Sequence, residues 1–296
     1  MIVLICSHKT NGEAVNARNL AKFLRTRGLT VFERTLHGVP DVILAKDYES
    51  VVQAYCRYPS VPIVYLVPGS EHAVTLNESA TDLMKRDPAT LVDLVPEEVL
   101  ANRLATRIVP NSELSGRLFR FIYPAFVEKL TRPINTSLVS TNPYPSLRHC
   151  HYDVGFVVSD CNRGVKGAAL ARTILAHCAL STLSKVVVGD HCEGLPRMRY
   201  DDLLRFLPHV KVIIIPSLFD ASPNLVVEAV SCGTMVITTA DVGNTDLLPT
   251  DWIVTNRLNI DEWASRILHC IAHPVQAVLP TLNDDLLYLI DSCVKK

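Results

Sequence analysis

The sequence has no Cys-x-x-Cys pair, no tandem repeat and no low-complexity tract outside one Pro- and Ser-rich stretch. Its nine cysteines are scattered singly along 296 residues. The odd number and the spacing exclude a zinc site built on paired cysteines and predict reduced thiols instead of a disulfide framework. Reduced thiols in turn favour a cytoplasmic protein.

Charge of one sign is also lacking, because the formal net charge is −1 and no long run of Lys or Arg occurs. This excludes the electrostatic footprint of a nucleic-acid-binding protein, so we expect no nucleic-acid partner. The N-terminal stretch "MIVLICSH" is apolar, yet it lacks a basic leader and reaches polar residues too early for a signal peptide or a membrane span. We therefore expect a soluble protein.

Short β-branched runs alternate with helical patterns along the whole chain, which is typical of βαβ units around a mainly parallel sheet. A hydrophobic content of 48% over this length suits two cores of ordinary size. Runs that predict strands include "IVLIC", "PIVYLVPG", "YDVGFVVSD" and "VKVIIIPS". We predict an α/β protein made of two Rossmann-like doubly wound domains that face a central cleft.

The stretch "TRPINTSLVSTNPYPSLRHC" interrupts this alternation and has no sustained period, which indicates a linker. The predicted organisation is an N-terminal Rossmann-like domain over 1–135, a linker over 136–150 and a C-terminal Rossmann-like domain over 151–296. Ligands of doubly wound sheets bind at the carboxyl ends of the strands. Functional residues are therefore sought in the loops that follow strands.

One such loop follows the predicted strand "VKVIIIPS" and leads into a helix. Ser222 is predicted as the N-cap and Pro223 as the first helical position, with the helix starting at Asn224. The first N–H groups, near Asn224 and Leu225, carry the positive end of the helix dipole and suit a phosphate or sugar hydroxyls.

Glu228 lies further along this helix within the apolar run "LVVEAV". A buried lone carboxylate costs several kcal/mol unless it is paired or hydrogen-bonded. A vicinal diol such as a nucleotide ribose satisfies both carboxylate oxygens. An internal ion pair, or a helix position that is in fact exposed, would account for the charge equally well at this level.

The whole stretch "SLFDASPNLVVEAVSCGTMVITTADVGNTDLL" resembles the donor-site signature of retaining glycosyltransferases of family four, which have the GT-B fold. That signature has two acidic residues separated by seven positions, here Asp220 and Glu228. Asp220 stands where the family usually has Glu, so its reach toward the sugar is one methylene shorter. The resemblance extends to "VGFVVSDCNRGVKGAAL" and implies that Arg163 and Lys166 face the donor diphosphate. It also implies that 151–296 is the nucleotide-sugar-binding domain and that 1–135 is a reduced acceptor-side domain.

Other positions carry roles by the same resemblance, each with a plainer alternative. Gly189 is expected near the nucleotide base, or simply in a tight turn. Gly12 is expected to let the backbone approach donor phosphates or acceptor. His72 is expected to act as the cleft histidine that touches the sugar, or to be an ordinary loop histidine.

The resulting hypothesis is a retaining hexosyltransferase that uses a UDP- or GDP-linked donor and an acceptor hydroxyl on a glycan, glycoprotein or lipid. It needs no cofactor and no metal, in line with the family. The alternatives are a catalytically inactive nucleotide-sugar or glycan-binding module or subunit, and a GT-B nucleotide-sugar epimerase. One set of basic and aromatic residues has two possible interpretations, peripheral membrane contact or a solvated face plus core. The set is Arg103, Arg107, Arg117, Arg120, Phe119 and Phe121.

Overall fold

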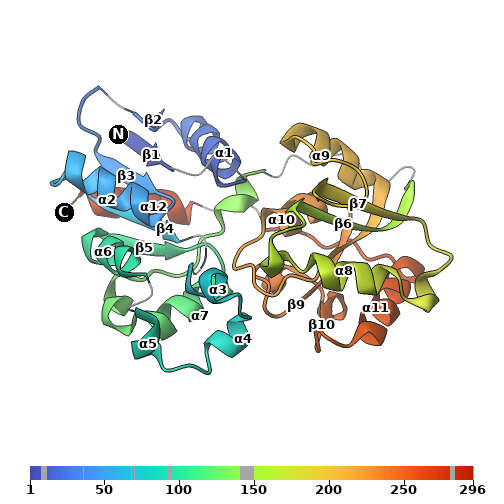
Figure 1. Cartoon of the computed structure of the whole chain (residues 1–296). Helices are drawn as coiled ribbons and strands as arrows, with labels where there is room; N and C mark the ends of the chain where they lie inside the picture. The colour runs from blue at the N-terminus through green and yellow to red at the C-terminus, as the bar shows by residue number, and fades with distance from the viewer. Residues whose placement is uncertain are drawn as a thin grey trace. The chain divides into compact units, whose positions relative to one another are not determined.

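The computed structural model describes all residues except 8–11, 36, 68, 70, 93–94, 141–149, 281–283 and 296. At residues 12–14, 71–72 and 139–140 it describes the backbone but not the side chains. The chain forms two compact units, each built around one five-stranded sheet (Figure 1). Unit 1 comprises Met1–Thr75, Asp82–Ser140 and Thr281–Lys296. Unit 2 comprises Leu76–Thr81 and Thr141–Pro280.

The sheet of unit 1 is parallel throughout and has the order β2-β1-β3-β4-β5. Its strands are β1 (Ile2–Cys6), β2 (Thr30–Glu33), β3 (Val42–Ala45), β4 (Ile63–Val67) and β5 (Arg107–Pro110). The helices of this part of the chain are α1 (Gly12–Thr26), α2 (Tyr48–Arg57), α3 (Glu71–Leu76), α4 (Ala80–Leu83), α5 (Pro88–Val92), α6 (Pro96–Leu104) and α7 (Glu113–Ile122).

Local sequence explains where several of these helices begin and end. The Asp47 side chain accepts a hydrogen bond from the Ser50 amide and caps α2, and the Ser112 side chain caps α7 in the same way through Ser115. After α1, Gly28 adopts φ +82°, a left-handed conformation that a side chain would disfavour. The glycine thus lets the chain turn away from α1, which ends at Thr26.

The sheet of unit 2 is also parallel, with the order β10-β9-β8-β6-β7. Its strands are β6 (Tyr152–Asp160), β7 (Lys185–Asp190), β8 (Val210–Ile215), β9 (Met235–Thr239) and β10 (Ile253–Val254). Its helices are α8 (Ala168–Leu175), α9 (Tyr200–Phe206), α10 (Asn224–Ser231) and α11 (Ile260–Ala272). The predicted alternation of strands and helices is confirmed in both units.

Helices cover both faces of the second sheet, α8 and α11 on one face and α9 and α10 on the other (Figure 1). The central strands β8 and β9 are buried on almost all sides, and β8 is accordingly a nearly continuous run of Val and Ile. Trp263 of α11 is fully buried, and its indole N–H donates to the Arg257 carbonyl oxygen at 2.9 Å. The core therefore fixes the strands whose ends carry the candidate site.

The last helix, α12 (Asp285–Val294), packs against β3 and belongs to unit 1. An ion pair of 2.9 Å between Arg27 and Asp284 holds its start, and Arg132 pairs with Asp285. Sequence patterns had placed this segment with the second domain, because an amphipathic helix shows which face is apolar and not which sheet it covers.

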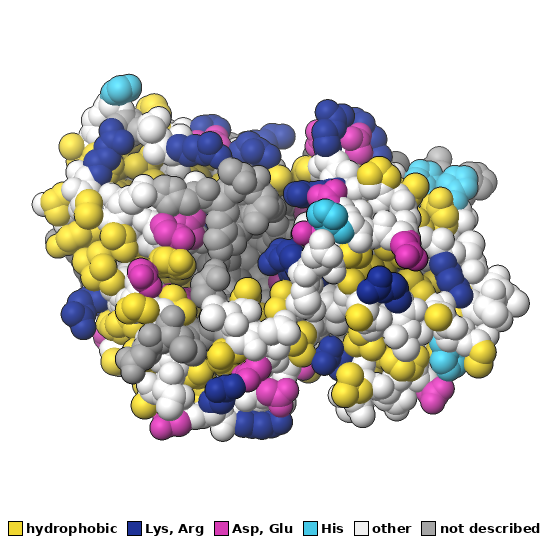
Figure 2. All heavy atoms as spheres, in the orientation of Figure 1, with side chains coloured by type: hydrophobic (Ala, Val, Ile, Leu, Met, Phe, Trp, Pro, Cys, Tyr) yellow, Lys and Arg dark blue, Asp and Glu magenta, His cyan; other side chains and the backbone are white. Residues whose placement is uncertain are grey.

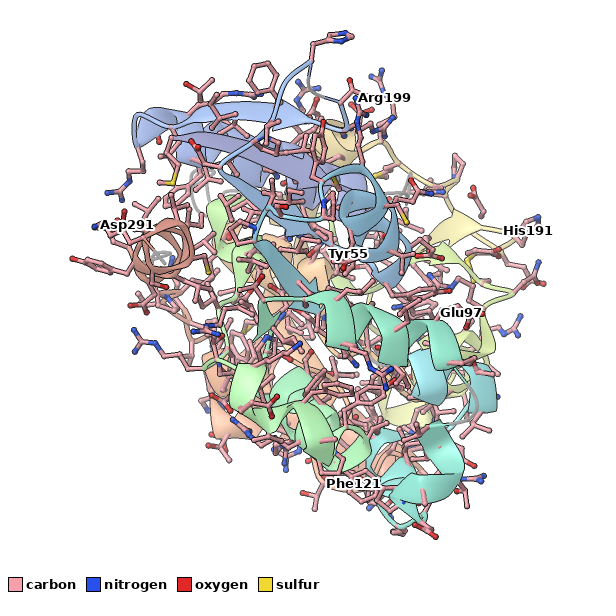
Figure 3. All side chains as sticks on the ribbon, turned by 90° about the vertical axis from the view of Figure 1, so that its left-hand side faces the viewer. Tyr55, Glu97, Phe121, His191, Arg199 and Asp291 are labelled. Carbon is pink, nitrogen blue, oxygen red and sulfur yellow. A yellow bond between two sulfur atoms is a disulfide. The ribbon has the colours of Figure 1, made fainter. Side chains whose placement is uncertain are left out.

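Within the described part of the chain, no helix has the length and apolar character needed to cross a membrane. On the face in Figure 2, basic and acidic side chains are interspersed. The aromatic residues considered for lipid contact do not form one exposed surface, because Phe119 is 3% exposed and packs on Tyr123 in the core of unit 1, while Phe121 is half-buried at the edge of that unit (Figure 3). For Phe119, the reading as core is correct.

Candidate functional site

The neighbouring strands β6 and β8 mark the point in unit 2 where the chain changes direction across the sheet. From β6 the chain first moves to β7 on one side and later continues through β8 to β9 on the other. The connections from two such strands lead to opposite sides of the sheet, and ligands of open parallel sheets bind at the carboxyl ends of these strands. The loop after β6 contains a short 3-10 turn, η3 (Gly164–Lys166), and the loop after β8 leads into α10.

These two loops touch through their backbones. The Leu218 amide donates to the Val165 carbonyl oxygen at 2.8 Å. Gly167 adopts φ +72°, and a Cβ atom there would lie 2.1 Å from the carbonyl oxygen of Pro216. A side chain is therefore excluded at Gly167 by both conformation and space. The glycine fixes η3 directly against the end of β8.

Lys166 and Asp220 are brought together by this contact. The Lys166 ammonium group donates to the Asp220 carboxylate, and the two side chains are 21% and 19% exposed. The backbone of Asp220 is held in turn by the loop after β9, because the Gly243 amide donates to its carbonyl oxygen at 2.7 Å. The sequence assigned both residues to the site, and the structure adds that they form an ion pair.

Arg163 precedes η3 and is exposed. Within the described residues its guanidinium group has no ion pair or hydrogen bond. A free cation one turn from Lys166 is consistent with an anion-binding loop, although an ordinary solvated loop residue has the same geometry.

The start of α10 differs in one detail from the sequence prediction. The helix begins at Asn224 as expected, but the N-cap is Pro223, which stays extended with ψ 122° and has no side-chain capping bond. Instead, the buried amide of Asn244 donates to the Ser222 hydroxyl oxygen at 3.4 Å and to the Pro223 carbonyl oxygen at 3.2 Å. Ser222 lies one residue too early to cap the helix.

Asn244 was missed by sequence reasoning, although the Gly-Asn pair after β9 is a turn signal. It adopts φ +67°, which Asn tolerates better than most residues. This conformation directs its side chain to the segment before α10. The amide of Leu225, in the first turn, has no hydrogen-bond acceptor among the described residues, so one N–H at the positive end of the helix is available to a ligand.

Glu228 lies one turn into α10 and is 8% exposed. Among the described residues, no cation pairs with its carboxylate and no group donates a hydrogen bond to it. Burial raises the pKa of Glu228 from 4.5 to about 7. The interpretation as an exposed position is therefore wrong, and the described residues offer no internal ion pair. Hydroxyl and other O–H or N–H donors are the groups that satisfy such a carboxylate.

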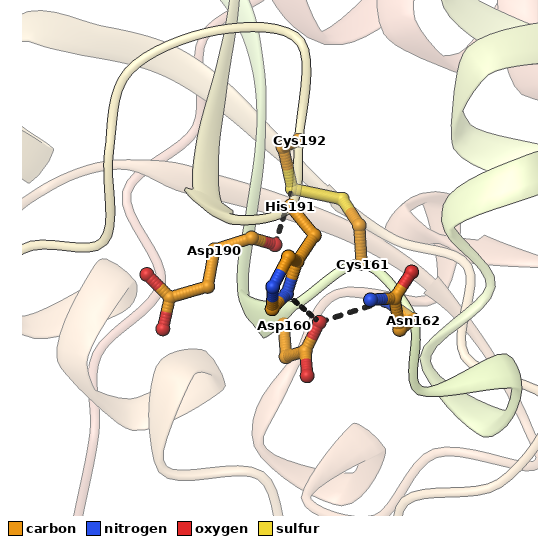
Figure 4. The surroundings of a disulfide bond; sticks show 6 residues. All are labelled: Asp160, Cys161, Asn162, Asp190, His191 and Cys192. Carbon is orange, nitrogen blue, oxygen red and sulfur yellow. Dashed lines mark hydrogen bonds and ion pairs between the residues drawn. A yellow bond between two sulfur atoms is a disulfide. The ribbon is translucent and has the colours of Figure 1, made fainter.

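A disulfide joins Cys161 to Cys192 beside the same edge of the sheet (Figure 4). Cys161 follows β6 and Cys192 follows β7, and the parallel pairing of these strands brings their Cα atoms to 5.5 Å. The expectation that every thiol is reduced is corrected here. The sequence does not indicate that two cysteines 31 positions apart form a disulfide. The register of β6 and β7 brings them together.

Polar residues flank this disulfide. His191 pairs with the Asp160 carboxylate at 3.0 Å, and the Asn162 amide donates to the same carboxylate at 2.9 Å. These hydrogen bonds, from the Asn162 backbone first and then from His191, hold the pKa of Asp160 below its ordinary value. The start of the loop that carries Arg163 and Lys166 is thus tied to β7 covalently and electrostatically.

Replacing Cys161 with Ser should lower the free energy of unfolding of unit 2 by about 3–4 kcal/mol, the cost of opening a loop of this length in the chain-entropy model. Urea denaturation without reductant measures the loss. Cys178→Ser, which removes an exposed free thiol, is the matched control and should have no effect. Excess dithiothreitol should abolish the difference between wild type and Cys161→Ser, and equal midpoints without reductant would contradict the cross-link.

Three further predicted site residues are less informative. Gly189 lies on β7, where a Cβ atom would be 2.5 Å from the Val158 carbonyl oxygen, so close packing against β6 already requires glycine. Gly12 is the first residue of α1, and the loop before it lies outside the described residues. His72 falls in α3, and its side chain lies outside the described residues as well.

Unit 1 carries a buried polar network at its own change of direction, between β1 and β3. Lys46 follows β3, is 3% exposed, and donates to the Asn16 side chain at 2.5 Å and to the Thr136 hydroxyl at 3.3 Å. Asn111 accepts from Thr136 and Asn16 donates to Ser137. Residues 136–138, predicted as linker, are therefore packed into unit 1, whereas 141–149 lie outside the described residues.

Part of the sequence matches a known protein family. Residues 176–273 match the family model described as Glycosyl transferases group 1. The match lies within unit 2, includes Asp220 and Glu228, and covers less than half of the chain. No curated protein is significantly similar to the sequence.

Solved structures resemble the chain over nearly its full length. Sucrose-phosphate synthase from Thermosynechococcus elongatus has a TM-score of 0.69 at 15% identity, covering 99% of this chain and 94% of that chain. An alpha-glucosyltransferase in complex with UDP and a 13-mer DNA has a TM-score of 0.62 at 10% identity, with 100% and 99% covered. HepE of Anabaena in complex with UDP-glucose has a TM-score of 0.59 at 17% identity, with 91% and 89% covered. The chain shares their two-domain, Rossmann-like GT-B fold, which confirms the predicted fold class.

Proposed function

We propose that the protein is a glycosyltransferase that binds a nucleotide diphosphate sugar in unit 2 and transfers its hexose to an acceptor hydroxyl with retention. The observation that carries the proposal is Glu228, a carboxylate 8% exposed without a partner among the described residues, one turn into the helix that follows the Asp220 loop. Two adjacent ribose hydroxyls would donate hydrogen bonds to the two oxygens of this carboxylate and so satisfy it. The family match over the same residues and the nucleotide complexes of the structural neighbours support this role.

The donor diphosphate lies, in this proposal, between η3 and the start of α10. Lys166 and Arg163 supply positive charge from the first element, and the Leu225 amide supplies a hydrogen bond from the second. Across the described ranges, no three or more His, Cys, Asp or Glu side chains form a group that could hold a metal ion. We propose that these cations and amides take the place of a metal ion, and turnover that survives EDTA treatment is the expected result.

Charge develops on the leaving phosphate as the glycosidic bond breaks, so the fixed cations act mainly in the transition state. Asp220 holds the Lys166 ammonium group in place and, with the adjacent backbone, faces the sugar. In the proposed route, which follows the family resemblance, the acceptor hydroxyl attacks from the face that the phosphate leaves, and its proton passes to the departing phosphate oxygen. The anomeric configuration is then retained without an enzyme nucleophile. The anomeric proton coupling in the NMR spectrum of the product distinguishes retention from inversion.

The acceptor is proposed to be a hydroxyl of a glycan, glycoprotein or lipid. The structural neighbours differ in this respect, since one is a sucrose-phosphate synthase and another is in complex with a modified DNA. Neither likeness selects an acceptor for this chain. We propose that Gly12 lies near the donor phosphates or the acceptor, His72 near the sugar, and Gly189 near the nucleotide base.

A donor screen tests the proposal directly. Among UDP-, GDP- and ADP-glucose at about one hundred times Kd, the specific donor should stabilise the native protein by about 2.7 kcal/mol through mass action, which raises the melting temperature by several degrees. Differential scanning fluorimetry measures the shift, with free glucose as the control. Absence of a shift with every nucleotide sugar and every matching nucleotide diphosphate would exclude a donor site.

A catalytically inactive binding module remains the second candidate, because Asp220 already neutralises Lys166 in the free protein. In that case the same donor should bind without turnover. Release of the nucleotide diphosphate, followed with and without candidate acceptors, separates the two: any sustained release supports the enzyme, and tight binding without release supports the module.

A further inference from the structure

The segment Leu76–Thr81, called the 76–81 segment below, comes from the N-terminal part of the chain but lies with unit 2. Asp241, in the loop after β9, holds one end of it. The Thr81 amide and the Thr81 hydroxyl both donate to the same Asp241 carboxylate oxygen, at 2.9 and 2.8 Å. Two hydrogen bonds to one ionised acceptor make this a specific attachment and not a passing contact.

The attachment lies next to the residues that hold Asp220. The Asp220 amide donates to the Asp241 carbonyl oxygen at 3.3 Å, and Asp220 pairs with Val242 in an isolated parallel bridge. One stretch of backbone after β9 therefore supports the carboxylate of the candidate site and, through the Asp241 side chain, the 76–81 segment. The position of the segment is coupled to that of Asp220.

The other end of the segment reaches η3. Asn77 adopts φ +53°, a left-handed conformation that few residues other than Gly take. Its amide oxygen lies 3.4 Å from the point where a Cβ atom of Gly164 would stand. Gly164 begins the three-residue turn that ends at Lys166, the partner of Asp220. The exposed Asn77 amide makes no hydrogen bond to any described residue.

The Asn77 amide thus lies against the first residue of η3, and Lys166, the last residue of η3, pairs with Asp220. Lys166 and Asp220 mark the phosphate and sugar end of the proposed donor, whereas Glu228 marks the ribose end on α10. A side-chain amide both donates and accepts hydrogen bonds, and so does each hydroxyl of a hexose. The lack of a side chain at Gly164 leaves the amide unobstructed on that side.

We propose that Asn77 is a specificity-determining residue that hydrogen-bonds hydroxyl groups of the transferred hexose, and that Asp241 is the residue that positions it through Thr81. This inference rests on the proposed function, because it assumes a nucleotide sugar in unit 2. It extends that function by assigning part of the sugar recognition to a segment outside the region of the family match.

The test compares a nucleotide sugar with its own nucleotide diphosphate, using the glucose donor that stabilises the wild type most. Asn77→Gly removes the amide while accepting the positive φ. It should raise the Kd of the nucleotide sugar about tenfold, as expected for one or two lost hydrogen bonds. The Kd of the nucleotide diphosphate should change less than about twofold, because no sugar is present to bind. Isothermal titration calorimetry measures both.

Two results would overturn the role of Asn77 and leave the proposed function standing. One is an unchanged Kd for the nucleotide sugar. The other is an equal loss for both ligands, which would indicate a contact to the nucleotide or a general disturbance. If wild type binds neither ligand, the proposed function itself fails, and the sugar role of Asn77 with it.

The positioning role of Asp241 has a readout that needs no ligand. In Asp241→Ala the Thr81 amide should exchange with deuterium about tenfold faster than in wild type, because it loses its acceptor. Asp246→Ala, which removes an exposed acid from the same loop region, is the matched control and should leave that amide unchanged. Equal exchange in wild type and Asp241→Ala would overturn the positioning role. With ligands, Asp241→Ala should reproduce the selective loss seen in Asn77→Gly.

Discussion

Replacing Glu228 with Gln should weaken binding of the nucleotide sugar by about 100-fold or more, because two charge-assisted hydrogen bonds to the ribose lose their common anion. Isothermal titration calorimetry at about pH 8 measures this loss, under conditions where the wild-type carboxylate is ionised. Glu193→Gln is the matched control, since Glu193 is exposed in the same unit. Unchanged affinity in Glu228→Gln would remove the ribose role and with it the main support for a donor site.

The same residue predicts how donor binding depends on pH. Burial raises the pKa of Glu228 to about 7, so the side chain is mostly neutral below that pH and must lose a proton to accept from both hydroxyls. Wild-type affinity for the nucleotide sugar should therefore rise about tenfold per pH unit up to about pH 7 and then level off. The profile of Glu228→Gln should be flat over this range. A flat wild-type profile would contradict a buried carboxylate at the site.

Stability of the free protein should change in the opposite direction. The folded pKa of Glu228 lies above the unfolded value of 4.5, so between these two values the native state binds the extra proton and the free energy of unfolding falls as pH rises. The loss amounts to about 3 kcal/mol once pH exceeds the folded pKa. Gln does not titrate. Glu228→Gln should thus be more stable than wild type by up to about 3 kcal/mol near pH 8, with the pH-dependent part of this gain gone below about pH 4.5. Urea denaturation at both pH values measures the difference.

The second large effect is expected for Lys166→Ala. Turnover should fall by about 100- to 1,000-fold, the usual cost of removing one fixed group that stabilises transition-state charge. Donor Kd should rise by less than about tenfold, because the ground state carries less charge on the leaving oxygen than the transition state does. Steady-state kinetics combined with direct titration separates the two. Lys185→Ala, which removes a lysine at the opposite, amino end of β7, is the matched control.

The ion pair with Asp220 provides an alternative explanation that must be separated from catalysis. Removing Lys166 leaves the half-buried Asp220 carboxylate without its partner, which alone could disturb the loop. In the double variant Lys166→Ala, Asp220→Asn, the unpaired charge is gone as well, and Asp220→Asn alone is its reference because Asp220 faces the sugar. If turnover of the double variant stays far below that of Asp220→Asn while stability recovers, Lys166 acts on the leaving group. Equal turnover in the double variant and Asp220→Asn would show that Lys166 only holds the loop in place.

The pattern of residues determined much of the architecture, because it depends on short-range regularities. Apolar β-branched runs predicted the strands of both sheets, and these strands are continuous in sequence because they are buried on both faces. Gly28 marked the end of α1 through its left-handed conformation. Glu228 could be singled out from the sequence because it is a charged residue among apolar neighbours. The structure confirms that this position is buried.

Several features remained hidden because they depend on which loops the sheet order brings together. The disulfide between Cys161 and Cys192 follows from the pairing of β6 with β7, and the ion pair between Lys166 and Asp220 follows from the place of β6 beside β8. Asn244 shows only a turn signal in sequence, yet its side chain holds the start of α10.

By itself, the sequence determined the fold class, the order of strands and helices, and the charge of Glu228 among apolar neighbours, since hydrophobic period, turn residues and a charge within an apolar run are local properties. Only the tertiary structure decided that α12 returns to unit 1, that Lys46 is buried in a polar network and that Asp241 binds Thr81. The physical reason is the same in each case. Contacts between residues far apart in the chain depend on the order of the strands and on which face of a sheet each helix covers. Neither can be predicted from the spacing of neighbouring residues.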